Sequence, residues 1–163
     1  MKALAVCLLL LLSPTLLCAA DAPNLLKPTN NVDSWRLEQI EGGKGTIKAD
    51  GDAIVFEVTE VDGTEWHVQA FQIDLNLKEG QTYSLKFNAK ASASRPVILN
   101  AMVDVDDWHE LGLHEDLYFG TEYKPYEFTF TATGVEPNKN RIGFMFGQET
   151  GKIYVKEMTL TAK

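Results

Sequence analysis

The stretch Gln81–Ala91, QTYSLKFNAKA, decides the fold class of this chain. Within it an apolar set of side chains alternates with a polar set. The two sets are Tyr83, Leu85, Phe87 and Ala89, and Ser84, Lys86, Asn88 and Lys90. A period of two is typical of a β-strand that has one buried face and one face in water. The stretch therefore predicts a strand that lies across a hydrophobic core.

The same kind of pattern extends in both directions along the chain. Further candidate strands are 34–39, 45–49, 53–58, 66–77, 96–105, 126–133, 141–147 and 152–161. Turn dipeptides such as Asp50-Gly51 separate several of them. No stretch combines helical periodicity with caps and sufficient length. About ten short strands at even spacing predict an all-β fold, a two-sheet antiparallel β-sandwich.

The segment Asp104–Glu122 lacks this pattern and is rich in acids, histidine and aromatic residues. We predict a long loop there, and loops of this length are usually functional or mobile.

Residues 1–20 have the layout of a secretory signal peptide. Lys2 supplies a positive start, Ala3–Leu12 is an apolar run, and Cys18-Ala19-Ala20 offers small residues for cleavage. The run is too short to span a bilayer, and no later segment is long enough. We expect cleavage after Ala20, one domain over 21–163, and an extracellular or periplasmic location. Lipid attachment at Cys18 is the alternative, although Leu17 before it is bulkier than usual.

The mature domain is expected to be acidic and free of disulfides. Cys7 and Cys18 both belong to the leader. The net charge of −8 becomes one unit more negative when Lys2 is removed. Such a surface repels phosphate backbones and anionic membranes, so nucleic acid is not an expected partner. The length suffices for one core without covalent staples.

Four segments, taken in order, resemble the bacterial carbohydrate-binding modules of families four and nine. They are Asn24-Leu25-Leu26 with Trp35, then 66–77 with 79–91, then 121–131, and finally 142–147 with 151–155. Together they cover roughly 24–161, nearly the whole mature domain. The resemblance implies a galactose-binding-like jelly roll with a concave face on one sheet. It also implies a non-catalytic protein that binds a polysaccharide or oligosaccharide there.

One position departs from the family pattern. Many members bind a structural calcium ion through an aspartate just after the last aromatic strand, and the matching residue here is Lys156, followed by Glu157. An ammonium group cannot ligate a cation, but it can satisfy the same oxygen atoms. We therefore expect no cofactor, and no calcium at this position.

A sugar site needs flat aromatic platforms and polar groups that match hydroxyls. The candidate ligand-binding residues are Trp66, Gln69, Gln72, Arg95, Asn100, Trp108 and Gln148. The two tryptophans would stack on sugar rings, and the others would bond hydroxyls. The family resemblance places sugar-contacting residues around the strand 66–77 and sets Gln148 at the border of the groove. The alternatives are a wet sheet face for the polar residues and a plug at the sandwich end for Trp108.

Three other functions remain open. A glycosidase would need two carboxylates across a cleft. The candidate pairs are Glu110 with Glu115 and Asp106 with Glu110, but all three residues belong to one acidic segment. A metal site would draw on His109 and His114 with Asp104, Asp106 and Asp107. The spacing of the two histidines matches no common zinc motif. A protein-binding or envelope-structural sandwich would present a flat apolar patch in place of an aromatic-walled groove.

Overall fold

The computed structural model describes residues 22–163, so the expected leader (1–20) lies outside the described residues. Two short 3-10 helices are η1 (Val32–Ser34) and η2 (Glu65–His67). The strands are β1 (Arg36–Gln39), β2 (Lys44–Asp50), β3 (Ala53–Glu60), β4 (Val68–Leu75), β5 (Thr82–Ala91), β6 (Arg95–Val103), β7 (Glu110–Phe119), β8 (Lys124–Thr131), β9 (Asn140–Met145) and β10 (Gly151–Ala162). The predicted all-β class is confirmed. No helix within 22–163 is long and apolar enough to cross a membrane.

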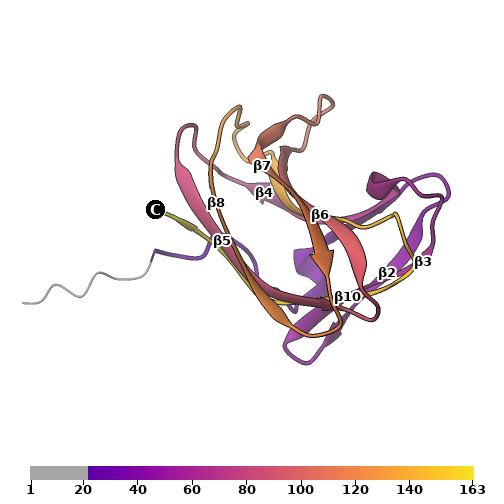
Figure 1. Ribbon diagram of the computed structural model, residues 1–163. Helices are drawn as coiled ribbons and strands as arrows, with labels where there is room; N and C mark the ends of the chain where they lie inside the picture. The colour runs from indigo at the N-terminus through magenta and orange to yellow at the C-terminus, as the bar shows by residue number, and fades with distance from the viewer. Residues whose placement is uncertain (1–21) are drawn as a thin grey trace, which may run out of the picture.

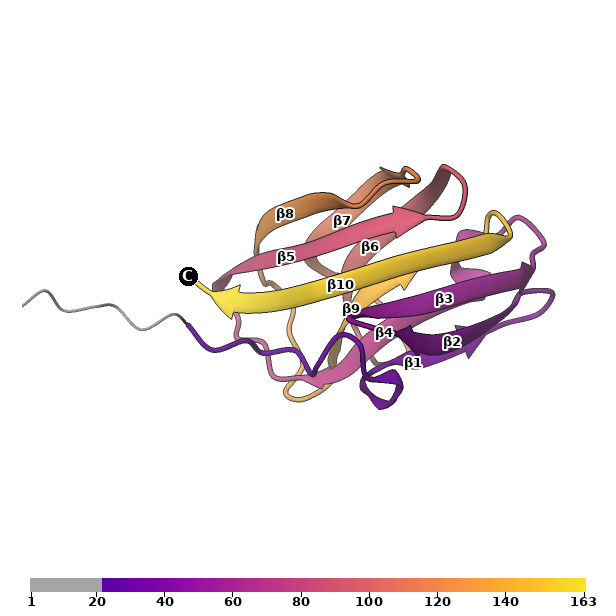
Figure 2. The same ribbon diagram turned by 90° about the horizontal axis from the view of Figure 1, so that it is seen from below.

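The strands form two five-stranded sheets, which are the two layers of the molecule (Figure 1). Sheet A has the order β1-β4-β9-β6-β7, and sheet B has the order β2-β3-β10-β5-β8. Neighbouring strands are antiparallel throughout. In Figure 2 the strands of sheet B lie side by side, with those of sheet A behind them. The chain crosses between the sheets repeatedly, as expected of a jelly roll.

Aromatic side chains from both sheets fill the space between the layers. The Phe87 ring of β5 meets the Phe144 ring of β9 edge-on, with centroids 5.3 Å apart. Trp35, placed just before β1, packs edge-on against Phe56 of β3 at 5.1 Å. Its indole N–H donates to the Thr29 carbonyl at 2.8 Å, so the one polar group of this buried side chain has a partner. These contacts join the sheets and leave the outer face of each one free.

The prediction of a loop over Asp104–Glu122 is wrong, because β7 occupies its centre and pairs with β6. Leu111, Leu113 and Phe119 point into the core, so a period of two is present. The intervening outward positions carry charged and aromatic side chains, which mask the alternation in the sequence. Residues 104–109 before β7 and residues 120–122 after it are irregular.

Candidate functional site

The outer face of sheet A is hollowed into a cleft of about 550 Å³. Side chains from all five strands of sheet A line it, together with residues of η2 and with Trp108 of the loop between β6 and β7. The lining residues are Glu38, Ile40, Glu65, Trp66, Gln69, Ile98, Asn100, Met102, Trp108, Glu110, His114, Arg141 and Met145. Apolar walls with a few converging polar groups are typical of a ligand-binding site.

Two half-exposed tryptophans belong to this lining. Trp66 in η2 is 41% exposed and Trp108 in the β6–β7 loop is 43% exposed. Both therefore expose part of a ring within the cleft, which is what the predicted stacking on sugar rings requires. Trp108 does not fold away to plug the end of the sandwich.

The structure holds Trp66 in a 3-10 turn and not in a strand, because β4 begins only at Val68. The His67 ring meets the Trp66 ring edge-on at 4.1 Å and binds Asp62 through Nδ1 at 2.6 Å. Gly147 donates its N–H to the Glu65 carbonyl at 2.8 Å. A Cβ atom on Gly147 would lie only 2.4 Å from the Thr64 carbonyl oxygen, so glycine allows this close approach.

Trp108 is fixed by its own backbone and by a guanidinium. It has a positive φ of 48°, which is uncommon for a residue other than glycine. Its N–H donates to the Val105 carbonyl at 2.9 Å. The Arg141 guanidinium carbon lies 4.6 Å from the centre of the indole and 4.0 Å from the centre of the Phe71 ring. Arg141 thus links the loop tryptophan to the sheet through cation–π contacts.

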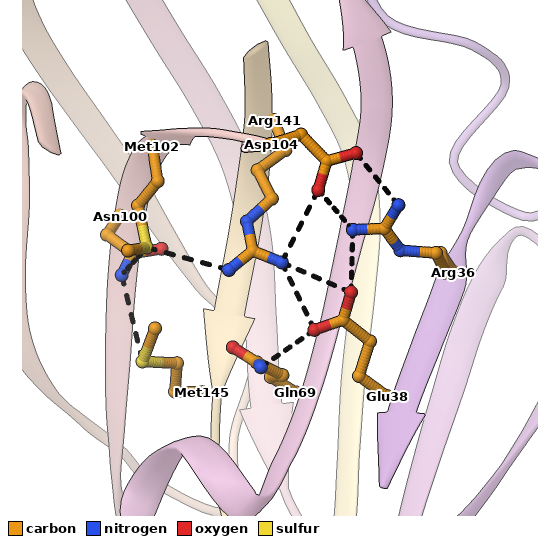
Figure 3. Close-up of polar contacts among 8 residues, drawn as sticks. All are labelled: Arg36, Glu38, Gln69, Asn100, Met102, Asp104, Arg141 and Met145. Atoms are coloured by element: carbon orange, nitrogen blue, oxygen red, sulfur yellow. Dashed lines mark hydrogen bonds and ion pairs between the residues drawn. The ribbon is translucent and has the colours of Figure 1, made fainter. Parts of the chain in front are cut away.

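Four charged side chains form a network beside the cleft (Figure 3). Arg36 donates to Asp104 through Nη1 at 2.8 Å and pairs with Glu38 at 2.6 Å. Arg141 donates from Nη1 to both oxygens of Glu38, at 3.2 and 3.1 Å. The hydrogen bond from Arg36 holds the pKa of Asp104 below its ordinary value, while burial lowers the pKa of Arg141. The network fixes Glu38 and Arg141 at one side of the cleft.

Two buried amides from the sequence prediction also lie here. The Gln69 nitrogen donates to Glu38 at 2.7 Å (Figure 3), and the Asn100 nitrogen donates to the sulfur of Met102 at 3.1 Å. Gln69 is 4% and Asn100 is 1% exposed. Gln69 Oε1, Asn100 Oδ1 and Arg141 Nε are buried and have no hydrogen-bond partner among the described residues. Buried polar atoms without partners are rare and call for an explanation.

The structure does not bring the other three candidates into the cleft. Gln72 is fully buried and exchanges hydrogen bonds with the backbone of Lys27, at 2.8 and 3.2 Å. Arg95 is buried and donates to the carbonyls of Phe146, at 2.7 Å, and of Glu149. Gln148 is exposed in the β9–β10 loop. Gln72 and Arg95 therefore brace the N-terminal segment and that loop.

Several donors of the rival metal and glycosidase sets are engaged in other contacts. Asp104 binds Arg36, and His109 bonds Asp107 at 2.8 Å and the Gly134 carbonyl at 2.6 Å. His114 bonds Glu110. A second group, Glu41, Asp62 and His67, places its donor atoms within 4.8 Å of one another. The hydrogen bond between Asp62 and His67 accounts for this grouping.

Sequence reasoning missed several residues of the site, above all Glu38, Met102, Arg141 and Met145. Arg141 carried a signal, since it is the only charged residue in the otherwise apolar or neutral run 140–147. Its partner Glu38 lies 103 positions earlier, a pairing that no local pattern reveals.

Fold and cleft together define a β-sandwich binding module. A family model described as a carbohydrate-binding domain, of families 4 and 9, matches residues 28–152. The chain belongs to this family and, as predicted, is a non-catalytic carbohydrate-binding module. Among curated proteins no sequence matches it.

Solved structures support the same fold. A family 4 carbohydrate-binding module has 22% identity and a TM-score of 0.74, over 85% of this chain and 93% of its own. The second N-terminal cellulose-binding domain of Cellulomonas fimi β-1,4-glucanase C has 16% identity and a TM-score of 0.68. The match covers 89% of this chain and 97% of that domain. A Clostridium thermocellum family 11 module in complex with a β-1,3-1,4-mixed-linked tetrasaccharide has 18% identity and a TM-score of 0.58. The match covers 88% of this chain and 97% of that module.

Proposed function

We propose that this protein holds a polysaccharide or oligosaccharide chain in the cleft of sheet A. The observation that carries the proposal is the pair of half-exposed tryptophans, Trp66 and Trp108, in the lining of the cleft. The apolar faces of sugar rings would lie against Trp66 and Trp108. Each such stacking contact is worth about 1–3 kcal/mol by analogy with other flat ligands.

Sugar hydroxyls would meet the polar side chains of the cleft lining, among them Glu65, Glu110 and His114. A hollow with aromatic walls and amides fits a glycan better than the flat apolar patch of a protein interface. Gln72, Arg95 and Gln148 are assigned no direct contact with the glycan in this proposal.

The first glycans to try are β-linked glucans. The Cellulomonas fimi domain is a cellulose-binding domain, and the family 11 module is in complex with a mixed-linked β-glucan tetrasaccharide. Their resemblance to this chain is one of fold, so it only ranks the ligands to be tested.

Affinity electrophoresis in gels that contain soluble glucans, xylans or mannans tests the proposal. At least one polysaccharide should retard the native protein relative to a non-binding reference protein. The double variant Trp66→Ala/Trp108→Ala should migrate as it does in a gel without polysaccharide. Unchanged mobility of the native protein in every gel would remove the proposal.

We also propose that the chain is exported. The leader-like pattern of residues 1–20 supports this, as does the placement of Cys7 and Cys18 within it. N-terminal sequencing of the protein recovered from an expressing culture should begin at Asp21. A product that retains Met1 would contradict export by cleavage.

For the calcium position, we propose that the Lys156 ammonium takes the place of a cation. Its Nζ donates to Asp52 at 3.0 Å and lies 4.9 Å from the centre of the Tyr123 ring. A second positive charge would be repelled there. Addition of millimolar calcium or of a chelator should therefore leave the melting temperature unchanged, and a clear rise with calcium would contradict the proposal.

A further inference from the structure

Each of the two tryptophans in the cleft lining is followed directly by a histidine. The dipeptides are Trp66-His67 in η2 and Trp108-His109 before β7, and they contain two of the three histidines in the sequence. Neither histidine lines the cleft. In both dipeptides Nδ1 of the histidine hydrogen-bonds the carboxylate of a nearby aspartate. An aspartate–histidine pair therefore lies beside each exposed indole.

The pair beside Trp66 is Asp62–His67, and it connects both ends of η2. Asp62 Oδ1 accepts the N–H of Thr64, which precedes η2, at 3.1 Å, and Oδ2 lies 2.6 Å from Nδ1 of His67, the last residue of η2. His67 is 5% exposed, and its ring meets the Trp66 ring edge-on at 4.1 Å. The pair thus fixes the turn on either side of Trp66 and supplies a buried ring that the indole contacts.

The pair beside Trp108 is Asp107–His109, and it connects two loops. Nδ1 of His109 lies 2.8 Å from Asp107, and Nε2 donates to the Gly134 carbonyl in the β8–β9 loop at 2.6 Å. Gly134 has a positive φ of 73°, and a Cβ atom on it would lie only 2.7 Å from Nε2, so a larger residue would displace the imidazole. The hydrogen bond to Asp107 raises the pKa of His109, so at pH 6 both ring nitrogens carry a proton. The β6–β7 loop is thus held at the residue that follows Trp108.

We propose that these two aspartate–histidine pairs are positioning groups, which do not touch the glycan and raise its affinity by holding Trp66 and Trp108 in place. This inference rests on the proposed function and assigns part of the affinity to residues outside the cleft lining. A side chain that is already held in place loses less conformational entropy when a ligand binds to it, so the complex is tighter. A binding site depends in this way on supporting residues that fix the orientation of its contact residues.

Double-mutant cycles test the proposal through glycan affinity. The variants are Asp62→Ala and His109→Ala, because both side chains are partly exposed, whereas replacement of the buried His67 would leave a gap in the protein. Each is measured alone and in combination with Trp66→Ala or Trp108→Ala by titration calorimetry at pH 6. The probes are cellotetraose, xylotetraose and mannotetraose, and the cycles use whichever of them binds the native protein. Thermal unfolding checks that every variant is folded.

Each variant should weaken the affinity about threefold when both tryptophans are present. Asp62→Ala should have no further effect in Trp66→Ala and should keep its full effect in Trp108→Ala. His109→Ala should show the reverse pattern. Non-additivity that is confined to one partner indicates that a residue acts through that tryptophan. Losses of the same size in all backgrounds would overturn the proposal, because the pairs would then act on the cleft as a whole.

Asp50→Ala is the matched control for Asp62→Ala. Asp50 is exposed at the end of β2 in sheet B, so its replacement makes the same change in net charge on the sheet opposite the cleft. This variant should bind the tetrasaccharide as the native protein does. An equal loss in the two variants would attribute the effect of Asp62→Ala to charge and would overturn its role in positioning.

Acrylamide quenching of fluorescence follows Trp66 without a glycan. In Trp108→Phe the remaining tryptophans are Trp66 and the buried Trp35, so the accessible fluorescence comes from Trp66. Asp62→Ala should make the quenching steeper in this background, because the indole would be held less firmly. Unchanged quenching would contradict the role of Asp62 at η2.

The outcomes separate the two proposals. If a tetrasaccharide binds the native protein and binds Asp62→Ala and His109→Ala equally well, positioning by the pairs is overturned and the proposed function stands. If none of the tetrasaccharides binds and no polysaccharide retards the protein, the proposed function and this inference both fail.

Discussion

The outer faces of the two sheets carry similar residue types but differ in how these are used. On sheet B, Lys86 and Glu127 pair at 3.1 Å with 57% of each side chain exposed, and Lys152 lies 3.6 Å from Glu57. Pairs of this kind contribute little, because water competes for both partners. On sheet A, the Arg141 side chain is 3% exposed, packs on aromatic rings and bonds Glu38.

The difference shows how one sandwich can combine a solvated surface with a binding surface. On the outer face of sheet B the charged side chains are paired or in water, and the hydroxyl of Ser84 is its one buried side-chain polar atom without a partner among the described residues. On the outer face of sheet A the Arg141 charge is withdrawn from water. Four buried polar atoms there have no partner within 22–163, namely Arg36 Nε, Gln69 Oε1, Asn100 Oδ1 and Arg141 Nε.

Arg141→Met should have the largest effect. The substitution leaves Glu38 and Asp104 without their shared guanidinium, and it removes the support beneath Trp108. We expect a loss of about 3 kcal/mol in the free energy of unfolding, near the lower end for breaking a buried ion pair. Urea denaturation measures this loss. A midpoint equal to that of the native protein would show that the network is as weak as the pairs on sheet B.

Trp108→Ala should have the next largest effect, and it should lower glycan affinity without lowering the free energy of unfolding. Loss of one stacking platform should weaken glycan affinity by about 1–3 kcal/mol, which titration calorimetry resolves. Tyr118→Ala is the control, since this exposed aromatic of β7 lies outside the cleft lining. Equal losses in the two variants would mean that the tryptophan has no special place in binding.

Acid should weaken the network on sheet A in a defined pH range. The pKa of Asp104 lies below its ordinary value of 3.8 because Arg36 donates a hydrogen bond to it. Its contribution is therefore complete above pH 3.8 and is lost as the pH falls through the lower folded-state value. Urea midpoints measured from pH 6 downward should fall less steeply below pH 4 for Asp104→Asn than for the native protein. Parallel curves would contradict this assignment.

Lys86→Met should have the smallest effect. Its exposed partner Glu127 stays hydrated after the change, so the urea midpoint should remain that of the native protein. A shift comparable to that of Arg141→Met would remove the distinction between the two faces.

Alternation along the strands was sufficient to predict the sandwich, because each strand buries one face. It failed at β7, where charged outward residues concealed the inward Leu111 and Leu113. For the site, the chemistry of stacking and amide bonding, together with the family resemblance, selected Trp66, Gln69, Asn100 and Trp108, all of which line the cleft.

The same period of two explains why other candidates fall elsewhere. Gln69 and Gln72 are an odd number of positions apart on β4, so their side chains lie on opposite faces of sheet A. Arg95 and Asn100 have the same relation on β6. The pairing of Arg141 with Glu38 was beyond prediction, because it depends on which distant strands become neighbours.

Strand β7 stands at the edge of sheet A and supplies Glu110 and His114 to the cleft, both of them outside the charged network. Protein engineers who want a different sugar preference should randomise these two positions first. The floor set by β4, β9 and β6 would then serve as a constant scaffold, with β7 as the wall that can be varied from one designed binder to the next.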